Sequence, residues 1–476
     1  MKRFFLLGGL LITFFLWVPG LMLAADTRLT DGKDQSAVEI TIYNSNIGLV
    51  KDHRKISLGK GTQELRFMDV ASQVIPSSVS IKSLSRPDSL SVLEQNYEYD
   101  LLNPGKLLDK YVGKEVKLVT KNLYTDKEET VTAMVLSNDN GVPIYRINNE
   151  ITFSHPGRIL FPGLPENLIP KPTLVWLLNS TTDATQDIEA LYLTNGINWQ
   201  ADYVLLLNAK ETMAGLSGWV TIDNKSGAAY RDARLKLVAG DIHRVEEYYP
   251  AERFRATSLA VTTLQSQFKE DAFFEYHIYK LERKATIKEN QTKQINFLEA
   301  ENVPVRKEFI YRGAQYYFQD RHEELQSKDK VAVFIEISNR KEDNLGTPLP
   351  KGTIRVYKLD SDGSSQFVGE DRVEHTRKDE KVRARLGYAF DIGATRKQTQ
   401  WEKISKDTYE VAFEITLKNH KKEDITVKVV EPLPGDWKVL ESSLPYKKED
   451  ANTIFFDVPA KKDGEVKLSY RVRVRF

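Results

Sequence analysis

Apolar and polar residues alternate with a period of two along much of this 476-residue sequence, and no other feature constrains its fold as strongly. Three of the clearest runs are VEITI at 38–42, TYEVAFEITL at 408–417 and EVKLSYRVRVRF at 465–476. Because neighbouring side chains of a strand point to opposite faces, each run predicts a strand with one buried face and one solvated face. The pattern predicts an all-β fold made of antiparallel sheets.

Helical patterns are scarce, and the clearest is NPGKLLDKYVG at 103–113. Asn103 is placed to cap the helix, Pro104 suits its first position, and Gly113 suits its end. We therefore expect an N-terminal β region at 36–112 that contains one short helix.

Turn signals divide the segment that follows. Between 114 and 153, four short apolar runs are separated by turns, notably at Asn140-Gly141 and Asn148-Asn149. This spacing predicts a small β-barrel-like module at 113–155. Five prolines between 156 and 172 disfavour a regular sheet, so we expect an extended Pro-rich strap there.

The remaining chain is predicted to form β-sandwiches of the immunoglobulin-like type. We expect one β-sandwich at 173–243 and a C-terminal β-sandwich region at 272–476. A charged, aperiodic loop at 244–271 separates them. That loop is either a crossover between domains or an insertion within one domain, and the sequence leaves both open.

The N-terminus has the layout of a secretory signal peptide. Lys2 and Arg3 precede a long apolar run, and the pairs Pro19-Gly20 and Ala24-Ala25 are typical of processed leaders. We predict a signal peptide at 1–25 and a periplasmic or extracellular mature protein. Because the apolar run is long enough to span a bilayer, an uncleaved anchor is the alternative.

The chain has no cysteine, which excludes disulfides, thiol nucleophiles and cysteine-type zinc sites. Its 68 basic and 67 acidic side chains become 66 and 67 without Lys2 and Arg3, giving a net charge of −1. Without a basic excess or a basic face with interleaved aromatics, we expect no nucleic-acid partner. The mature chain is expected not to span a membrane, and its candidate partners are an envelope glycan or other envelope proteins.

Motifs for common enzyme chemistry are missing. The sequence contains no GxSxG, P-loop, GxGxxG, HxH or HExxH pattern. The scattered histidines are His53, His155, His243, His277, His322, His375 and His420. We therefore assign no catalytic, cofactor-binding or metal-binding residue, and no cofactor.

The segment LDSDGSSQFVGED invites a calcium interpretation. Asp360, Asp362, Ser364 and Asp371 fall at EF-hand positions one, three, five and twelve. Ser365 stands where an EF-hand loop needs glycine, and strand-like runs flank the segment. A hairpin turn at Asp-Gly is therefore the better explanation.

Two other features allow alternatives. One is a polar cluster that could hold a cation, act as acid and base, or form a solvated loop; it contains Asp241, His243, Glu246 and Glu247. The other is the closing YRVRVRF, whose arginines would protect the edge of a soluble sheet. An outer-membrane β-barrel, which ends in a similar strand, is a lesser alternative because uniform ten-residue strands are missing.

Trp199 lies in LYLTNGINWQADYVLLL, between apolar runs at 188–194 and 201–207. Both runs are predicted strands, and Asn195-Gly196 supplies the positive φ angles needed to leave the first. An indole on a loop could be a ligand platform. We expect instead that Trp199 folds over the end of a sandwich and is buried in the core.

Several blocks, in order along most of 38–476, resemble a large bacterial family. They are YDLLNPGKLLDKYVGKEVKL, LTNGINWQADYVLLL, WVTIDNKSGAAYRDARLKLVAGD, FFEYHIYKLERKATIKENQTKQINFL, LGTPLPKGTIRVYKLDSDGSSQFVGEDRVEHT and EPLPGDWKV. The family is defined by a C-terminal domain of unknown function, similar to the C-terminal part of mucoidy inhibitor A-like proteins. The long coiled-coil insertion associated with those proteins has no counterpart here. The resemblance implies an exported, β-rich architecture and brings no established catalytic residues.

Two functions remain open at this point. The favoured one is a binding or scaffold β-sandwich protein of the bacterial envelope, because no catalytic constellation is visible. The alternative is an envelope glycan or peptide hydrolase in which carboxylates such as Asp202, Asp241 or Glu370 converge in an inter-domain cleft.

The leader gives a first testable prediction. The exported chain should begin at Ala25 or Asp26, because the small residues before Asp26 suit signal-peptide cleavage. Mass spectrometry of the exported protein would establish its first residue. A retained Met1, together with membrane pelleting that resists carbonate, would favour the anchor instead.

Overall fold

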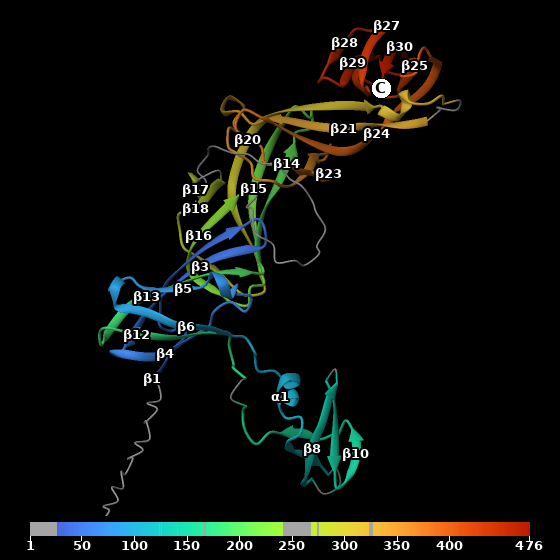
Figure 1. Ribbon diagram of the computed structural model, residues 1–476. Coiled ribbons are helices and arrows are strands. Elements are labelled where there is room, and N and C mark those ends of the chain that lie inside the picture. Colours follow the sequence, from blue (N-terminus) through green and yellow to red (C-terminus); the bar gives the residue numbers. More distant parts are fainter. Residues whose placement is uncertain are drawn as a thin grey trace, which may run out of the picture. The chain divides into compact units, whose positions relative to one another are not determined.

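Strands make up most of the chain that the structure describes, as the alternation predicted (Figure 1). This computed structural model describes residues 26–122, 124, 126–139, 141–165, 168–240, 268–273, 276–322 and 327–476. Its helices within these ranges are α1 (Pro104–Lys110) and the 3-10 helices η1 (Pro76–Ser78), η2 (Pro87–Ser89), η3 (Gln315–Phe318) and η4 (Lys341–Asp343). The all-β prediction is confirmed. The predicted signal peptide, the cluster at 241–247 and most of the charged loop lie outside the described residues.

The chain divides into two compact units. Unit 1 comprises Met1–Ser36, His53–Val70 and Ser80–Ala190, and unit 2 comprises Ala37–Asp52, Ala71–Val79 and Leu191–Phe476. None of the helices in the described ranges is long and apolar enough to cross a membrane.

Two of the sheets lie within unit 1. The first has the order β1 (Asp26–Thr30), β4 (Gly61–Met68), β12 (Thr173–Ser180), β6 (Leu90–Glu98). The second has the order β10 (Glu150–Phe153), β9 (Val142–Ile147), β8 (Glu128–Asp139), β7 (Glu115–Lys121), β11 (Arg158–Leu160). The second is the module predicted at 113–155, but β10 and β11 are its edges, so the barrel-like module is an open sheet.

This module has a small core of its own. The core contains Tyr111, Val116, Leu118, Ala133, Val135 and Tyr145, with Ile159 and Phe161 packed against it. Helix α1 precedes β7 and begins as predicted, because the side chain of Asn103 accepts a hydrogen bond from the backbone N–H of Lys106 at 3.0 Å. The predicted strap at 156–172 contains β11, which pairs with β7.

Two larger sheets complete the fold. The eight-stranded sheet has the order β17 (Phe268–Phe273), β18 (Tyr276–Leu281), β16 (Tyr230–Ala239), β2 (Gln35–Tyr43), β3 (Ile47–Leu58), β13 (Ala184–Asn195), β5 (Ser80–Ser83), and β19 (Ala285–Ile287) also pairs with β16. The thirteen-stranded sheet has the order β23 (Ser365–Val373), β22 (Gly352–Leu359), β14 (Ile197–Leu207), β15 (Met213–Asn224), β20 (Gln291–Arg312), β21 (Ser327–Ser338), β24 (Lys381–Lys403), β25 (Thr408–Asn419), β30 (Gly464–Arg475), β27 (Asp436–Ser442). Its remaining strands are β26 (Ile425–Pro432), β28 (Tyr446–Lys448) and β29 (Thr453–Ala460).

Two unusually long strands organise unit 2. Strand β20 has 22 residues and pairs first with β15 and then with β21 and β26. Strand β24 has 23 residues and pairs first with β21 and then with β25. The same two strands therefore take part in two successive portions of the sheet.

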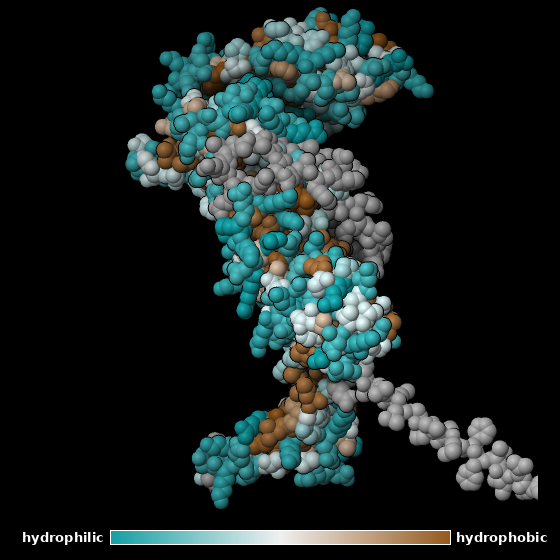
Figure 2. Space-filling view, turned by 90° about the vertical axis from the view of Figure 1, so that its left-hand side faces the viewer, coloured by the Kyte–Doolittle hydropathy of each residue, from teal (hydrophilic) through white to brown (hydrophobic). Residues whose placement is uncertain are grey.

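Many of the outward-facing side chains are polar, and the face seen in Figure 2 is mainly hydrophilic.

The closing strand differs from the prediction in one respect. Strand β30 pairs with β25 on one side and β27 on the other, so it is not an edge strand. Its outward arginines, Arg471, Arg473 and Arg475, pair with Glu441, Glu410 and Asp407. These side chains therefore form ion pairs on the face of the sheet instead of protecting an edge.

Trp199 is packed, as predicted. Its side chain is 2% exposed, its Nε1 donates to the carbonyl oxygen of Val238 at 3.1 Å, and its ring meets Tyr279 edge to face at 6.2 Å. Trp199 belongs to β14 of the thirteen-stranded sheet, whereas Val238 and Tyr279 belong to β16 and β18 of the eight-stranded sheet. The indole therefore joins the two sheets within unit 2. Strand β14 begins at Ile197, so Trp199 lies inside the strand. Of the pair Asn195-Gly196, only the glycine adopts a positive φ (78°).

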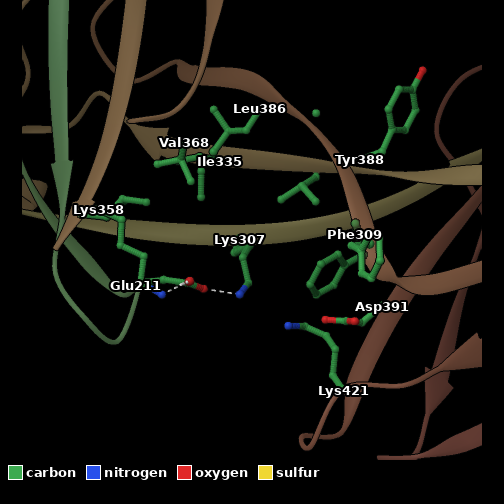
Figure 3. A pocket seen from close by; sticks show the side chains of 15 residues that line it. Glu211, Lys307, Phe309, Ile335, Lys358, Val368, Leu386, Tyr388, Asp391 and Lys421 are labelled. Carbon is green, nitrogen blue, oxygen red and sulfur yellow. Dashed lines mark hydrogen bonds and ion pairs between the residues drawn. The ribbon is translucent and has the colours of Figure 1, made fainter. Parts of the chain in front are cut away.

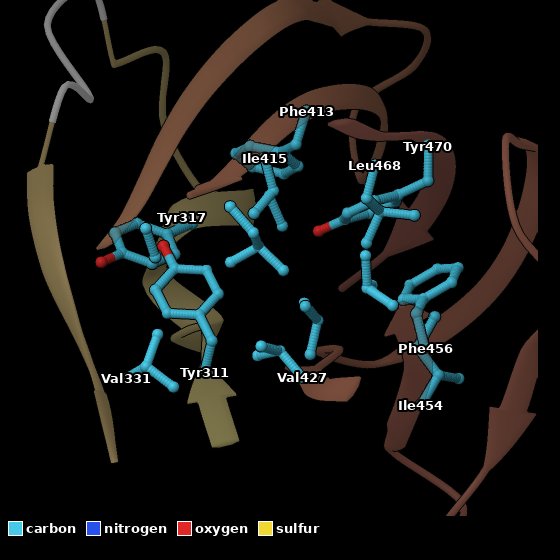
Figure 4. Packing of buried hydrophobic residues seen from close by; sticks show 14 of the residues in the cluster. Tyr311, Tyr317, Val331, Phe413, Ile415, Val427, Ile454, Phe456, Leu468 and Tyr470 are labelled. Carbon is cyan, nitrogen blue, oxygen red and sulfur yellow. The ribbon is translucent and has the colours of Figure 1, made fainter. Parts of the chain in front are cut away.

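Apolar residues of β20, β25, β26, β29 and β30 pack together in the C-terminal core (Figure 4). A charge pair, Arg396 with Glu431, has no solvent exposure. Arg396 on β24 donates to Glu431 on β26 at 2.5 and 3.2 Å and to the hydroxyl of Tyr311 at 3.2 Å. Burial alone would lower the pKa of Arg396, but Glu431 and the neighbouring tyrosines raise it well above its usual value. The guanidinium therefore stays charged inside an apolar core.

A glycine makes room for this pair. A Cβ atom on Gly313 would lie 2.3 Å from Oε2 of Glu431 and 2.9 Å from Nη2 of Arg396. No larger residue fits at this position without moving the buried ions. The glycine that follows β20 is therefore needed for the close approach of the chain to the ion pair.

Trp199 gives a stability prediction. Trp199→Ala should lower the free energy of unfolding by about 3 to 5 kcal/mol, because the two sheets lose a large buried ring and its hydrogen bond. Urea denaturation would measure the loss. Trp219→Ala, on the neighbouring β15 and 37% exposed, should cost distinctly less, and equal costs would argue against a special packing role for Trp199.

The buried pair of Arg396 and Glu431 gives a second stability prediction. Glu431→Gln should cost about 3 to 5 kcal/mol, because it leaves the Arg396 guanidinium buried without a counter-ion. The double variant Arg396→Met with Glu431→Leu should be less destabilised, since it removes both charges together. Urea midpoints of the two variants would decide, and the opposite order of stability would refute this account.

Candidate functional site

A pocket of about 230 Å³ opens in unit 2, where β20, β21 and β24 lie beside β22, β23 and the end of β14 (Figure 3). We call it the β20–β24 pocket. It is lined by Leu207, Glu211, Lys307, Phe309, Val333, Ile335, Lys358, Val368, Leu386, Gly387, Tyr388, Ala389, Phe390, Asp391 and Lys421.

One end of the pocket is organised around Glu211. The side chain of Glu211 pairs with Lys307 of β20 and, at 2.6 Å, with Lys358 of β22 (Figure 3). Glu211 belongs to the turn between β14 and β15, where its backbone donates to the carbonyl oxygen of Asn208 and adopts a φ of 57°. This left-handed conformation is unfavourable for a residue with a long side chain, so the turn is held against a local cost.

The electrostatics of this end follow from the two lysines. Partial burial raises the pKa of Glu211, but the hydrogen bonds and charges of Lys307 and Lys358 outweigh burial and leave the pKa below its usual value of 4.5. Glu211 is therefore ionised at neutral pH and fixes both ammonium groups. Asp391 and Lys421 supply a further charge of each sign (Figure 3), so the lining carries three cations against two anions.

Two irregular strands shape the opposite wall. In β24, Tyr388 pairs with Ala332 but Gly393 pairs with Lys330, so several residues between them have no counterpart on β21. In β23, Phe367 and Gly369 pair with consecutive residues of β22, which leaves Val368 as an extra residue. Bulges of this kind re-aim side chains and are common next to functional sites.

These bulges present apolar side chains to solvent. Phe390 is 101% exposed, Tyr388 52% and Val368 41%. The ring of Tyr388 also lies against Arg385 at 4.7 Å and Lys330 at 5.4 Å. The pocket thus combines an exposed aromatic rim, an apolar floor with Val333 and Ile335, and one charged end.

The carboxylates of the hydrolase hypothesis lie elsewhere. Asp202 and Glu370 are brought together, because both pair with Arg355 at 3.1 Å. Asp202 also accepts from the hydroxyl of Thr221 at 2.6 Å. Neither carboxylate lines the β20–β24 pocket, and Asp241 lies outside the described residues.

The segment at 360–371 forms the predicted hairpin between β22 and β23. Leu359 pairs with Ser365, and Gly363 turns the chain with a φ of 86°. One oxygen of Asp360 accepts from the backbone N–H groups of Asp362 and Ser364, and the other accepts from the side-chain amide of Gln366. Across the described ranges, no group of three or more histidine or acidic side chains is arranged to hold a metal ion.

No protein-family model matches this chain, and the curated proteins contain no match to it.

The main residues of the pocket were not predicted from the sequence. Glu211 is 96 residues from Lys307 and 147 from Lys358, so their association could not be seen locally. A weaker signal was present at Gly387, since a glycine inside a strand pattern indicates a bulge or close backbone approach.

The Glu211 cluster predicts a pH-dependent stability. Glu211→Gln should lower the melting temperature at neutral pH, with a cost of about 1 kcal/mol for these partly exposed pairs. Because the folded-state pKa lies below 4.5, the carboxylate contributes fully above that pH and loses its contribution as the pH falls through the lowered pKa. Melting curves recorded from neutral to acidic pH should therefore converge for parent and variant.

Glu465→Gln is a suitable control, because Glu465 is 45% exposed and makes a surface pair with Lys418 at 3.2 Å. Its effect should be smaller at every pH. A difference between parent and Glu211→Gln that stays constant into acid would show that the charge of Glu211 is not responsible.

Proposed function

We propose that this chain is an exported bacterial envelope protein that acts as a binding or scaffold protein and holds a segment of another envelope protein in the β20–β24 pocket. The signal-peptide pattern at 1–25 and the resemblance to an exported β-rich family support the location. The pocket supports binding.

The observation that carries the proposal is the fully exposed Phe390 on the bulge of β24. Leaving a phenylalanine in water contributes nothing to folding, whereas burial against a partner would be favourable. Aromatic side chains beside apolar pockets are typical centres of binding energy in protein interfaces. Phe390, Tyr388 and Val368 together offer such a centre.

The charged end favours an acidic partner segment. Lys307, Lys358 and Lys421 outnumber Glu211 and Asp391 within the lining, and Arg385 and Lys330 flank the aromatic rim. An apolar side chain next to a carboxylate would match both parts of the pocket. Electrostatic complementarity of this kind mainly increases specificity and the rate of association.

Hydrolysis by the predicted carboxylates is less well supported. A glycosidase needs one protonated and one ionised carboxyl group facing the same substrate. Asp202 and Glu370 instead both form ion pairs with Arg355 at 3.1 Å, and neither lines the β20–β24 pocket.

Site-specific photo-crosslinking in living cells would test the proposal. A photoreactive phenylalanine analogue at Phe390 should give one discrete protein adduct in the envelope. The same analogue at Tyr124, which is 99% exposed in unit 1, is the matched control and should not. Adding Lys307→Glu to the chain that carries the analogue at Phe390 should reduce the adduct, because it reverses one charge of the pocket.

Equal adducts from both positions, or none from Phe390, would contradict binding at this pocket. Release of soluble fragments from purified envelope glycan, abolished by Asp202→Asn, would favour the hydrolase instead.

A further inference from the structure

Strand β23 has a free side at the rim of the β20–β24 pocket. It is the edge strand of the thirteen-stranded sheet, and β22 is its only strand partner in the described ranges. Its residue Val368 lines the pocket, where Figure 3 shows it next to Leu386 of β24. The free side of β23 is therefore continuous with the pocket.

Only the first half of this edge is open. A Cβ atom on Gly369 would lie 2.6 Å from the carbonyl oxygen of Leu386, and the carboxylate of Asp371 accepts from the backbone N–H of Arg385 at 2.7 Å. Strand β24 therefore lies against the second half of β23, although the two strands are not paired in the part of the chain that the structure describes. Before Gly369 this cover ends, and Phe367 is 57% exposed.

Main-chain hydrogen-bonding groups point outward from the open half. The N–H of Asp360 donates to the carbonyl oxygen of Ser364 at 2.9 Å, so the main chain of Ser364 faces β22. Successive residues of an antiparallel strand face a given neighbour alternately. Gln366 therefore also faces β22, whereas the N–H and C=O groups of Ser365 and Phe367 face away from it. Among the described residues, no strand lies on that side to pair with them.

The side chains of the open half do not protect it. Edge strands commonly carry charged residues or proline, which discourage pairing with another chain. Between Asp362 and Glu370 the sequence is GSSQFVG, which contains neither a charged residue nor a proline. This part of β23 is therefore suited to main-chain pairing with a further strand.

We propose that the partner segment held at the β20–β24 pocket adds to the sheet as an extended strand along 365–368 of β23. This inference rests on the proposed function and specifies how the segment is bound. In strand addition, main-chain hydrogen bonds give affinity, and pockets for alternate side chains give specificity. Both features adjoin here, because the open edge ends at Val368 in the pocket lining.

The pairing of β22 with β23 also indicates the composition of the segment. Lys358 pairs with Gln366, two residues before Val368, and both Lys358 and Val368 line the pocket. Alternate residues of an added strand turn to the same face. The segment should therefore carry an acidic and an apolar residue two positions apart. A second copy of this chain is a poorer occupant, because each pocket lining carries three cations against two anions and like charges would meet.

Phe367→Pro tests the main-chain contact, because it removes the outward N–H without removing a hydrogen bond to β22. Phe367→Ala removes the same side chain but keeps the N–H. Each change is made in the chain that carries the photoreactive analogue at Phe390. The adduct should be about tenfold weaker with Phe367→Pro than with Phe367→Ala, as expected when one hydrogen bond is lost.

Melting curves of the two purified variants check that both fold. A second measurement does not depend on the proline variant. The photoreactive analogue at Ser365 should give the same adduct as the analogue at Phe390, because the added strand passes along Ser365. The matched control is the analogue at Tyr316, which is 56% exposed on η3 and does not line the pocket. This position should give no such adduct.

The outcomes separate this inference from the proposed function. Equal adducts from Phe367→Pro and Phe367→Ala, or no adduct from Ser365, would refute strand addition while the adduct at Phe390 still supports binding at the pocket. A missing adduct at Phe390 in the otherwise unchanged chain would overturn both. An adduct with twice the mass of this chain would assign the edge to a second copy and refute the partner segment.

Discussion

The buried pair of Arg396 and Glu431 sets a condition that much of the C-terminal part of unit 2 must meet. Two ions enclosed in an apolar core are tolerated only when their attraction and hydrogen bonds offset the loss of hydration. Here that requires β24 to bring the guanidinium, β26 the carboxylate and β20 the hydroxyl of Tyr311 to one point. The three strands are thereby fixed in register, and the β20–β24 pocket lies along two of them.

The β20–β24 pocket also arises from departures from regular pairing. It depends on bulges that expose Phe390 and Val368. A regular sheet turns side chains alternately inward and outward, which leaves little room for a concave surface. Bulges provide that room without breaking the strands. Local irregularity within a rigid sheet therefore gives this protein its candidate interaction surfaces.

Sequence reasoning succeeded where the signal was local. Alternation located the closing strand, the Asn103 cap located α1, and the hairpin at Asp360 and the burial of Trp199 followed from short patterns. It failed where contacts are distant. The cluster around Glu211 and the pairing of Arg355 with Asp202 join residues more than ninety positions apart. Strand β30 was misplaced at an edge because a sequence does not reveal how many neighbours a strand has.

The bulges of β24 have one more consequence, which concerns chain length. Eight steps along β24, from Arg385 to Gly393, match four steps along β21, from Phe334 to Lys330, so four residues are extra. Because four is an even number, the alternation of side chains is the same before and after the extra residues. Ala384 before them and Ala394 after them are both buried. Losing or gaining one residue here would turn Arg396 toward solvent, since a slip of one reverses every side chain. Related proteins should therefore change the number of residues in this segment only in pairs.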